Sequence, residues 1–157
     1  MTVIRKGEKK DLSDVLMLIK ELAIFERAEN EVETSVESME MDAFGTHKLF
    51  NFLVAETEIG IVGTAVYFYT YSTWKGKTLY LEDIVVNQSY RRNGIGTLLF
   101  EELLKIAQTE KVRRMSWQVL NWNEPAIQFY RKIDANFDDE WINCKLTFEQ
   151  LQNFKFK

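Results

Sequence analysis

The stretch Leu79–Gly96 reads LYLEDIVVNQSYRRNGIG, a strand pattern that runs into a glycine loop. Its first half consists mainly of aliphatic and aromatic residues, the types that fill a sheet covered on both faces. Glu82 and Asp83 nevertheless stand side by side in this apolar run. Because carboxylates are rarely buried without a partner or a function, the pair marks a candidate site. The alternative is a structural pair held by nearby hydroxyl groups or arginines.

The glycine loop Gly94-Ile95-Gly96 precedes a segment of helical periodicity. Backbone N–H groups of the loop and of the first helical turn would point to one place, which suits a phosphate. Two phosphate loops are excluded by spacing: the Gly-Lys-Ser/Thr of a Walker loop is missing, and Leu99 stands where a dinucleotide fingerprint requires a small residue. What remains is an Arg-x-x-Gly-x-Gly element over residues 91–96.

Periodicity around this stretch predicts an α/β chain. The predicted strands are Thr2–Arg5, Phe52–Ala55, Ile61–Tyr71, Thr78–Val86, Met115–Leu120 and Trp141–Leu146. The predicted helices begin at an Asp11 N-cap, cover Val36–Phe44 before Gly45, cover Thr97–Glu110, and begin at Asn123 and Pro125. Three strands of an antiparallel meander followed by a strand–helix–strand unit give a mixed sheet with helices on both faces.

Composition limits the classes of function. The 157 residues are 46% hydrophobic and 28% charged, which predicts a single globular domain over residues 1–157. Cys144 is the only cysteine, so we expect a reducing, cytoplasmic location and no zinc cluster or other metal site; His47 stands in a loop pattern. The longest apolar run, residues 59–69, is too short to span a membrane. A net charge of −4 argues against nucleic acid as a partner.

A second motif stands at Trp122–Tyr130, WNEPAIQFY. Together with the Arg-x-x-Gly-x-Gly element and the strand order, it makes the chain resemble the GNAT superfamily of acetyl-CoA-dependent N-acetyltransferases. Within that superfamily the chain is similar to the spermidine/spermine (diamine) N-acetyltransferases and their thialysine-acetylating relatives. The matching blocks, which cover nearly the whole chain, are IKELAIFE at 19–26, LVAE at 53–56, YSTWKGKTLYLED at 71–83 and the second motif itself.

The resemblance implies a central, mostly antiparallel twisted sheet of about six to seven strands with a splayed parallel pair. It also implies acetyl-CoA as co-substrate, without a metal. A bulge would free the backbone of residues 84–86 to bond the pantetheine arm. The implied acetyl-CoA contacts are Ile84, Val85, Val86, Arg91, Arg92, Asn93, Gly94, Ile95, Gly96, Thr97, Asn123, Ala126 and Tyr130.

Acetyl transfer to an amine requires a base and can use an acid, because the ammonium has a pKa of about 10.4 and the leaving thiol a pKa of about 8.5. Glu82 is the candidate base, acting through a water, since strand alternation places it on the face opposite Asp83. Asp83 would anchor the substrate. The resemblance makes Tyr130 the candidate acid, although Tyr130 also fits the apolar stripe of its helix and a packing role stays open.

The resemblance places further residues at the amine site, namely Phe25, Glu26, Trp74 and Trp141 beside Glu82 and Asp83. Two positions depart from the polyamine branch: Ser72-Thr73 replace an Asp-Pro pair, and Asp134 stands where a glycine is expected. The first departure favours the thialysine branch. A peptide N-acetyltransferase and a non-catalytic acyl-CoA-binding module remain alternatives. The acidic residues between positions 26 and 33 favour a small cationic amine, and the resemblance further implies a homodimer.

Overall fold

The computed structural model describes residues 1–156 and divides the chain into two compact units, residues 1–118 and 119–157. The first unit contains β1 (Val3–Lys6), α1 (Leu12–Phe25), α2 (Val36–Phe44), β2 (Asn51–Thr57), β3 (Gly60–Ser72), β4 (Gly76–Val86), α3 (Ile95–Thr109) and β5 (Met115–Ser116), with short 3₁₀ turns at Lys9–Asp11, Glu29–Glu31 and Gln88–Tyr90. The second unit contains α4 (Glu124–Lys132) and α5 (Phe148–Gln152).

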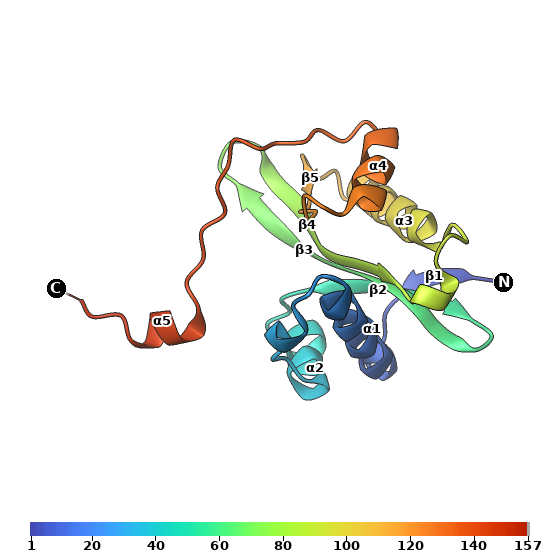
Figure 1. Ribbon diagram of the computed structural model, residues 1–157, viewed down its shortest axis with the longest axis horizontal. Helices are drawn as coiled ribbons and strands as arrows, with labels where there is room; N and C mark the ends of the chain where they lie inside the picture. The colour runs from blue at the N-terminus through green and yellow to red at the C-terminus, as the bar shows by residue number, and fades with distance from the viewer. Residues whose placement is uncertain (157) are drawn as a thin grey trace. The chain divides into compact units, whose positions relative to one another are not determined.

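The sheet has the order β1-β2-β3-β4-β5, antiparallel from β1 to β4 and parallel between β4 and β5. In Figure 1, α1 and α2 lie on one side of it and α3 on the other. Residues of α1, α2, β2 and β3 form one core cluster: Leu12, Val15, Leu16, Met39, Ala43, Phe52, Val54 and Val66. This arrangement confirms the predicted mixed α/β sheet with helices on both faces.

The parallel pair of strands is very short. β5 pairs with β4 only at Leu79↔Met115 and Tyr80↔Ser116, whereas β4 continues to Val86. A strand edge without a neighbour keeps backbone N–H and C=O groups available for other partners. The parallel pairing therefore ends before β4 reaches Glu82 and Asp83.

Two strand predictions were wrong. The described residues form five strands rather than six or seven, because Trp141–Leu146 has no strand conformation and its side chains are exposed. The predicted strand Met115–Leu120 is shortened to Met115–Ser116. An apolar pattern predicts only that a segment can pair, and the second unit contains no strand among its described residues to accept ladder hydrogen bonds.

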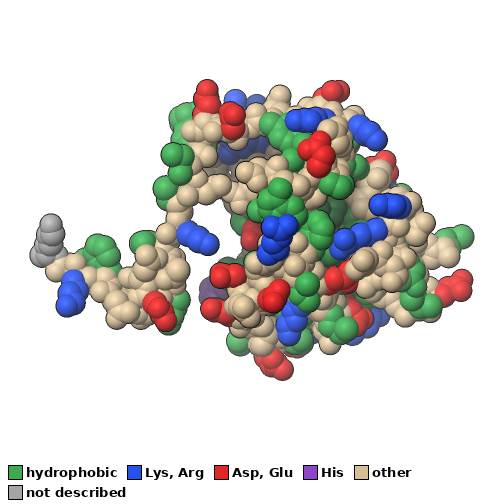
Figure 2. All heavy atoms as spheres, viewed as in Figure 1, with side chains coloured by type: hydrophobic (Ala, Val, Ile, Leu, Met, Phe, Trp, Pro, Cys, Tyr) green, Lys and Arg blue, Asp and Glu red, His purple; other side chains and the backbone are tan. Residues whose placement is uncertain are grey.

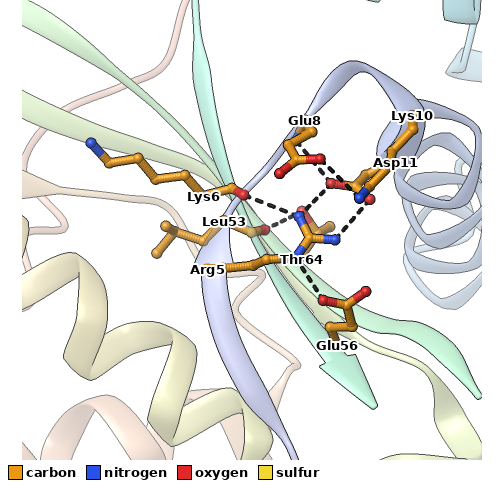
Figure 3. A network of polar contacts seen from close by, with 8 residues as sticks. All are labelled: Arg5, Lys6, Glu8, Lys10, Asp11, Leu53, Glu56 and Thr64. Atoms are coloured by element: carbon orange, nitrogen blue, oxygen red, sulfur yellow. Dashed lines mark hydrogen bonds and ion pairs between the residues drawn. The ribbon is translucent and has the colours of Figure 1, made fainter. Parts of the chain in front are cut away.

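The sequence pattern predicts that the side chain of Asp11 caps α1. Asp11 does stand at the N-cap position, but its side chain makes no capping hydrogen bond. Its carboxylate instead accepts hydrogen bonds from Nη1 of Arg5 at 2.7 Å and from Nη2 at 3.0 Å, and from the backbone N–H of Glu8 at 2.8 Å (Figure 3). Nε of Arg5 donates to Glu56 at 2.7 Å. Bidentate charge-assisted bonds are stronger than a neutral cap, so the buried Asp11 ties β1 to the start of α1.

Three other features would point to a different class of site: a surface of one charge, a membrane-spanning helix and a metal site. On the face drawn in Figure 2, acidic and basic side chains are interspersed. None of the helices over residues 1–156 combines the length and the apolar character that a bilayer crossing requires. Within the same range, no group of three or more His, Cys, Asp or Glu side chains is placed to hold a metal ion.

Candidate active site

A β-bulge at Glu82 shapes the candidate site. Leu81 lies opposite Tyr67 and Asp83 lies opposite Val66, which leaves Glu82 as an extra residue on β4. A bulge bends its strand and interrupts the regular alternation of side chains. The sequence argument that placed Glu82 and Asp83 on opposite faces therefore does not hold at this position, while the bulge implied by the family resemblance is present.

Three carboxyl groups come together at the bulge and at the end of α1, and we call Glu26, Glu82 and Asp83 the acidic cluster. Burial raises the pKa of Asp83 to about 6, together with the neighbouring charges of Glu82 and Glu26. Burial also raises the pKa of Glu26, while Glu82 is exposed. Carboxylates that repel one another in a partly buried site favour a bound cation.

A structural ion pair does not explain the acidic cluster. Among the described residues, no lysine or arginine lies within 4.0 Å of a carboxylate oxygen of Glu26, Glu82 or Asp83. Arg5 and Arg91 are bound to other acids. The cluster is therefore open to an external ammonium group.

The glycine loop leads directly into α3, as the sequence predicts. Gly94 precedes the first turn with a φ of 77°, in the left-handed region that favours glycine. No heavy atom lies within 4 Å of a Cβ built at Gly94, so the loop is open on that side. Arg92 also has a positive φ of 65°, and Arg92, Asn93, Gly94 and Thr97 are exposed. An exposed loop before the N-terminus of a 15-residue helix can hold a phosphate group.

The other residues predicted to contact acetyl-CoA differ in how far they are buried. Val85 and Ile95 are buried and support the loop from within, whereas Ile84, Val86 and Gly96 are half-buried. The β4 residues follow the point where β5 ends, so their backbone faces no fifth strand in the described part of the chain. This stretch fits an extended amide-bearing ligand that adds to the strand edge.

The side chain of Arg91, which the sequence predicts to contact acetyl-CoA, has three contacts within the first unit. Its Nε donates to the backbone oxygen of Val86 at 2.9 Å, its Nη2 lies 3.5 Å from Glu21, and its guanidinium lies 5.3 Å from the centre of the Phe25 ring. The side chain is thus engaged within the protein, and Phe25 lies next to the start of the glycine loop. Sequence reasoning missed Glu21; its one signal is the position four residues before Phe25 on α1, on the same helix face.

In the second unit, Asn123 caps α4, as predicted, with its Oδ1 accepting from the N–H of Ala126 at 3.5 Å. Tyr130 is 6% exposed, and its ring packs edge-on against Phe129 with 5.4 Å between centroids. Burial raises the pKa of Tyr130 to about 12, which keeps the phenol protonated at neutral pH. Tyr130 can therefore act as a proton donor.

The two tryptophans predicted at the amine site lie on the surfaces of their units. Trp74 is 83% exposed in the turn between β3 and β4, and Trp141 is 74% exposed. Glu82 lies six positions along β4 from Gly76, which corresponds to roughly 20 Å of strand. Of the aromatic residues predicted for the amine site, Phe25 lies beside Glu26 at the end of α1. Trp74 lies in the turn just before the first residue of β4, away from the bulge.

Comparisons with known proteins agree with this geometry. The model of the acetyltransferase (GNAT) family matches residues 16–134. Thialysine N-epsilon-acetyltransferase of Mus musculus is 32% identical over 162 residues, which cover 96% of this chain and 95% of that protein. Spermidine/spermine N(1)-acetyltransferase-like protein 1 of Homo sapiens is 35% identical over 158 residues, or 94% of this chain and 23% of that protein.

A solved structure agrees on the fold. An integron cassette protein from the mobile metagenome of V. cholerae has a TM-score of 0.78 and 23% identity, with 96% of this chain and 95% of that chain covered. The match to the family model includes the β4 bulge and the glycine loop. The chain therefore belongs to the GNAT family of acetyltransferases.

Proposed function

We propose that the protein transfers an acetyl group from acetyl-CoA to a primary amine of a small cation, such as a polyamine, a diamine or a thialysine-like amino acid. The observation that carries this proposal is the acidic cluster, which lies at the β4 bulge without a cationic partner among the described residues. An ammonium group would remove the repulsion between its carboxylates. The names of the mouse and human relatives support the same substrate class.

Acetyl-CoA fits the residues around the glycine loop, and it would supply the activated acetyl thioester. The exposed loop would hold the pyrophosphate, and the free edge of β4 over residues 84–86 would hydrogen-bond the pantetheine arm. Asn123 and Ala126 at the start of α4 would contribute further contacts to that arm. These assignments use the open space at Gly94 and the short β4–β5 pairing, both of which a bound ligand would fill.

For catalysis we propose that Asp83 holds the ammonium group while Glu82 takes its proton through a water. The freed amine nitrogen bonds to the thioester carbonyl carbon, the carbon–sulfur bond breaks, and the sulfur accepts a proton from the phenol of Tyr130. The nitrogen loses its second proton to water as the amide forms, and water returns a proton to the phenolate of Tyr130. A backbone N–H of β4 beside the bulge would polarise the carbonyl oxygen. Glu82 suits the role of base because it is exposed to water and lies next to the half-buried Asp83.

We further propose that both units belong to one acetyltransferase domain that forms a homodimer. The family match runs from residue 16 to residue 134 and so crosses the boundary at residue 118. The C-terminal segment exposes many large apolar side chains: Phe137, Trp141, Ile142, Leu146, Phe148, Leu151, Phe154 and Phe156. Exposed apolar residues in this number are typical of an interface with another chain.

The test of the reaction is CoA release with acetyl-CoA and a panel of spermidine, spermine, putrescine, thialysine, lysine and a short lysine peptide. We expect turnover of at least one small cation, with kcat/KM at least about tenfold above that of the peptide. Glu82→Gln should lower kcat by about 10²-fold or more. Turnover of the peptide alone would favour a peptide acetyltransferase, and acetyl-CoA binding without any turnover would favour a non-catalytic module.

The pH dependence tests Asp83. Because the pKa of Asp83 is raised to about 6, its carboxylate predominates only above that pH, and kcat/KM for the amine should fall as the pH decreases through about 6. Asp83→Asn should remove this acid limb and weaken amine binding. An unchanged limb in Asp83→Asn would assign the titration to another group.

The same pKa shift predicts an effect on stability. A carboxyl group whose pKa is higher in the folded than in the unfolded protein contributes stability at low pH and loses it as the pH rises, in this case between about 4 and about 6. Asp83→Asn should therefore raise Tm at pH 7 and leave it nearly unchanged at pH 4. Melting curves at the two pH values measure this difference.

A further inference from the structure

Glu21 connects α1 to the segment that leads into the glycine loop. Its Oε2 accepts a hydrogen bond from Nδ2 of Asn87 at 2.9 Å, and its Oε1 accepts one from the backbone N–H of Gln88 at 2.7 Å. Nη2 of Arg91 lies 3.5 Å from the same Oε1. Three donors within residues 87–91 thus converge on one carboxylate from another element.

The Arg91 side chain also contacts the end of β4 and the end of α1. It bonds the backbone oxygen of Val86, the last residue of β4, and lies against the ring of Phe25. The side chains of Glu21 and Arg91 are 28% and 35% exposed, so both groups are partly shielded from water. Partial shielding strengthens charge-assisted hydrogen bonds relative to a fully solvated pair.

The loop that follows needs such a restraint. Arg92 and Gly94 both have positive φ values, 65° and 77°, within three residues. A non-glycine residue in the left-handed region costs free energy and persists only where the surroundings hold it. The contacts of Glu21 end at Arg91, directly before the strained Arg92.

We propose that Glu21 is a positioning residue for acyl-CoA binding, which holds residues 87–91 so that the glycine loop presents its N–H groups to the phosphates. This inference rests on the proposed function, since it takes acyl-CoA as the ligand of the loop. Glu21 itself touches neither the thioester nor the amine. Without its carboxylate, the ligand would have to order the loop on binding, and its affinity would fall by that cost.

The hydrogen bond between Glu21 and Asn87 can be tested by exchanging its donor and its acceptor. Glu21→Gln places an amide donor opposite the Nδ2 donor of Asn87. Asn87→Asp places two carboxylates against each other, while it keeps the Oδ1 acceptor that bonds the N–H of Ser89 at 3.1 Å. In the double variant Glu21→Gln/Asn87→Asp, the new amide can donate to the new carboxylate while its oxygen still accepts from the N–H of Gln88.

We expect each single variant of the full chain to raise the Kd for CoA by about tenfold in titration calorimetry, and the double variant to return it to within about threefold of wild type. KM for acetyl-CoA should rise with Kd, while kcat at saturating acetyl-CoA changes less than about threefold. Glu40→Gln is the matched control, because it removes a helix carboxylate whose ion pair, with Lys9, is exposed. It should leave Kd unchanged.

Three outcomes would overturn the inference. If wild type binds CoA and both single variants bind it equally well, Glu21 has no positioning role, even if Tm falls, and the proposed function stands. If the single variants bind weakly and the double variant is not restored, the contact between Glu21 and Asn87 is not the cause. If wild type binds neither CoA nor acetyl-CoA, the inference fails together with the proposed function.

Discussion

Tyr130→Phe is expected to lower kcat by about 10²- to 10⁴-fold, the range for loss of a general acid. The substitution removes only the phenolic oxygen, and the ring can keep its packing against Phe129. Burial raises the pKa of Tyr130 to about 12, so at neutral pH the phenol carries the proton that the departing thiolate needs. Steady-state kinetics with the preferred amine at saturating acetyl-CoA measure the loss.

Two controls separate this acid role from packing. The Kd for CoA should stay within about twofold of wild type, because the hydroxyl group is proposed to act on the leaving sulfur. Tyr71→Phe removes the hydroxyl of a tyrosine that is 79% exposed and should leave kcat unchanged. If Tyr130→Phe lowers Tm but retains kcat, Tyr130 packs its helix and another group protonates the thiolate.

Arg5→Met should cause the largest loss of stability, about 3 to 5 kcal/mol, because it leaves the carboxylate of Asp11 buried without its cation. Asp11 is 3% exposed and accepts hydrogen bonds from both Nη1 and Nη2 of Arg5 (Figure 3). The loss should appear as a lower midpoint of urea unfolding. Lys9→Met is the matched control: its ion pair with Glu40 is exposed, and its removal should cost less than about 1 kcal/mol.

The pH dependence of unfolding gives a second measure of the same pair. Hydrogen bonds from Arg5 hold the pKa of Asp11 below its ordinary value, despite the opposing effect of burial. A lowered carboxyl pKa contributes stability at neutral pH that is lost as the pH falls below the usual aspartate range. This loss on acidification should be much smaller in Arg5→Met. Equal losses of stability in Arg5→Met and Lys9→Met would show that the buried pair contributes no more than a surface pair.

Helices and turns were predicted well because their signals are local. α2 begins and ends where the apolar spacing and Gly45 predict, and α4 begins at the Asn123 cap. The three meander strands lie within a few residues of their predicted bounds. Each of these elements depends on residues close in sequence, whose caps, turns and periodicity act within one or two turns of chain.

The wrong predictions concern the partner that a segment or a side chain takes in the folded chain. Trp141–Leu146 has strand composition but no strand to pair with in its unit. Asp11 has cap spacing, but its carboxylate is taken by Arg5 from β1. Arg91 stays a predicted acetyl-CoA contact, and the approach of its side chain to Glu21, 70 residues earlier in the chain, was not predicted.

The order of elements, the glycine loop before α3 and the family could all be inferred from short patterns. Tertiary structure alone decided the register of β3 against β4, which makes Glu82 the inserted residue of a bulge. It also decided the approach of Glu26 to Asp83, which helps to raise the pKa of Asp83 to about 6. Register, burial and the interaction of charges depend on distances between segments far apart in the chain, and local propensity contains no information about those distances.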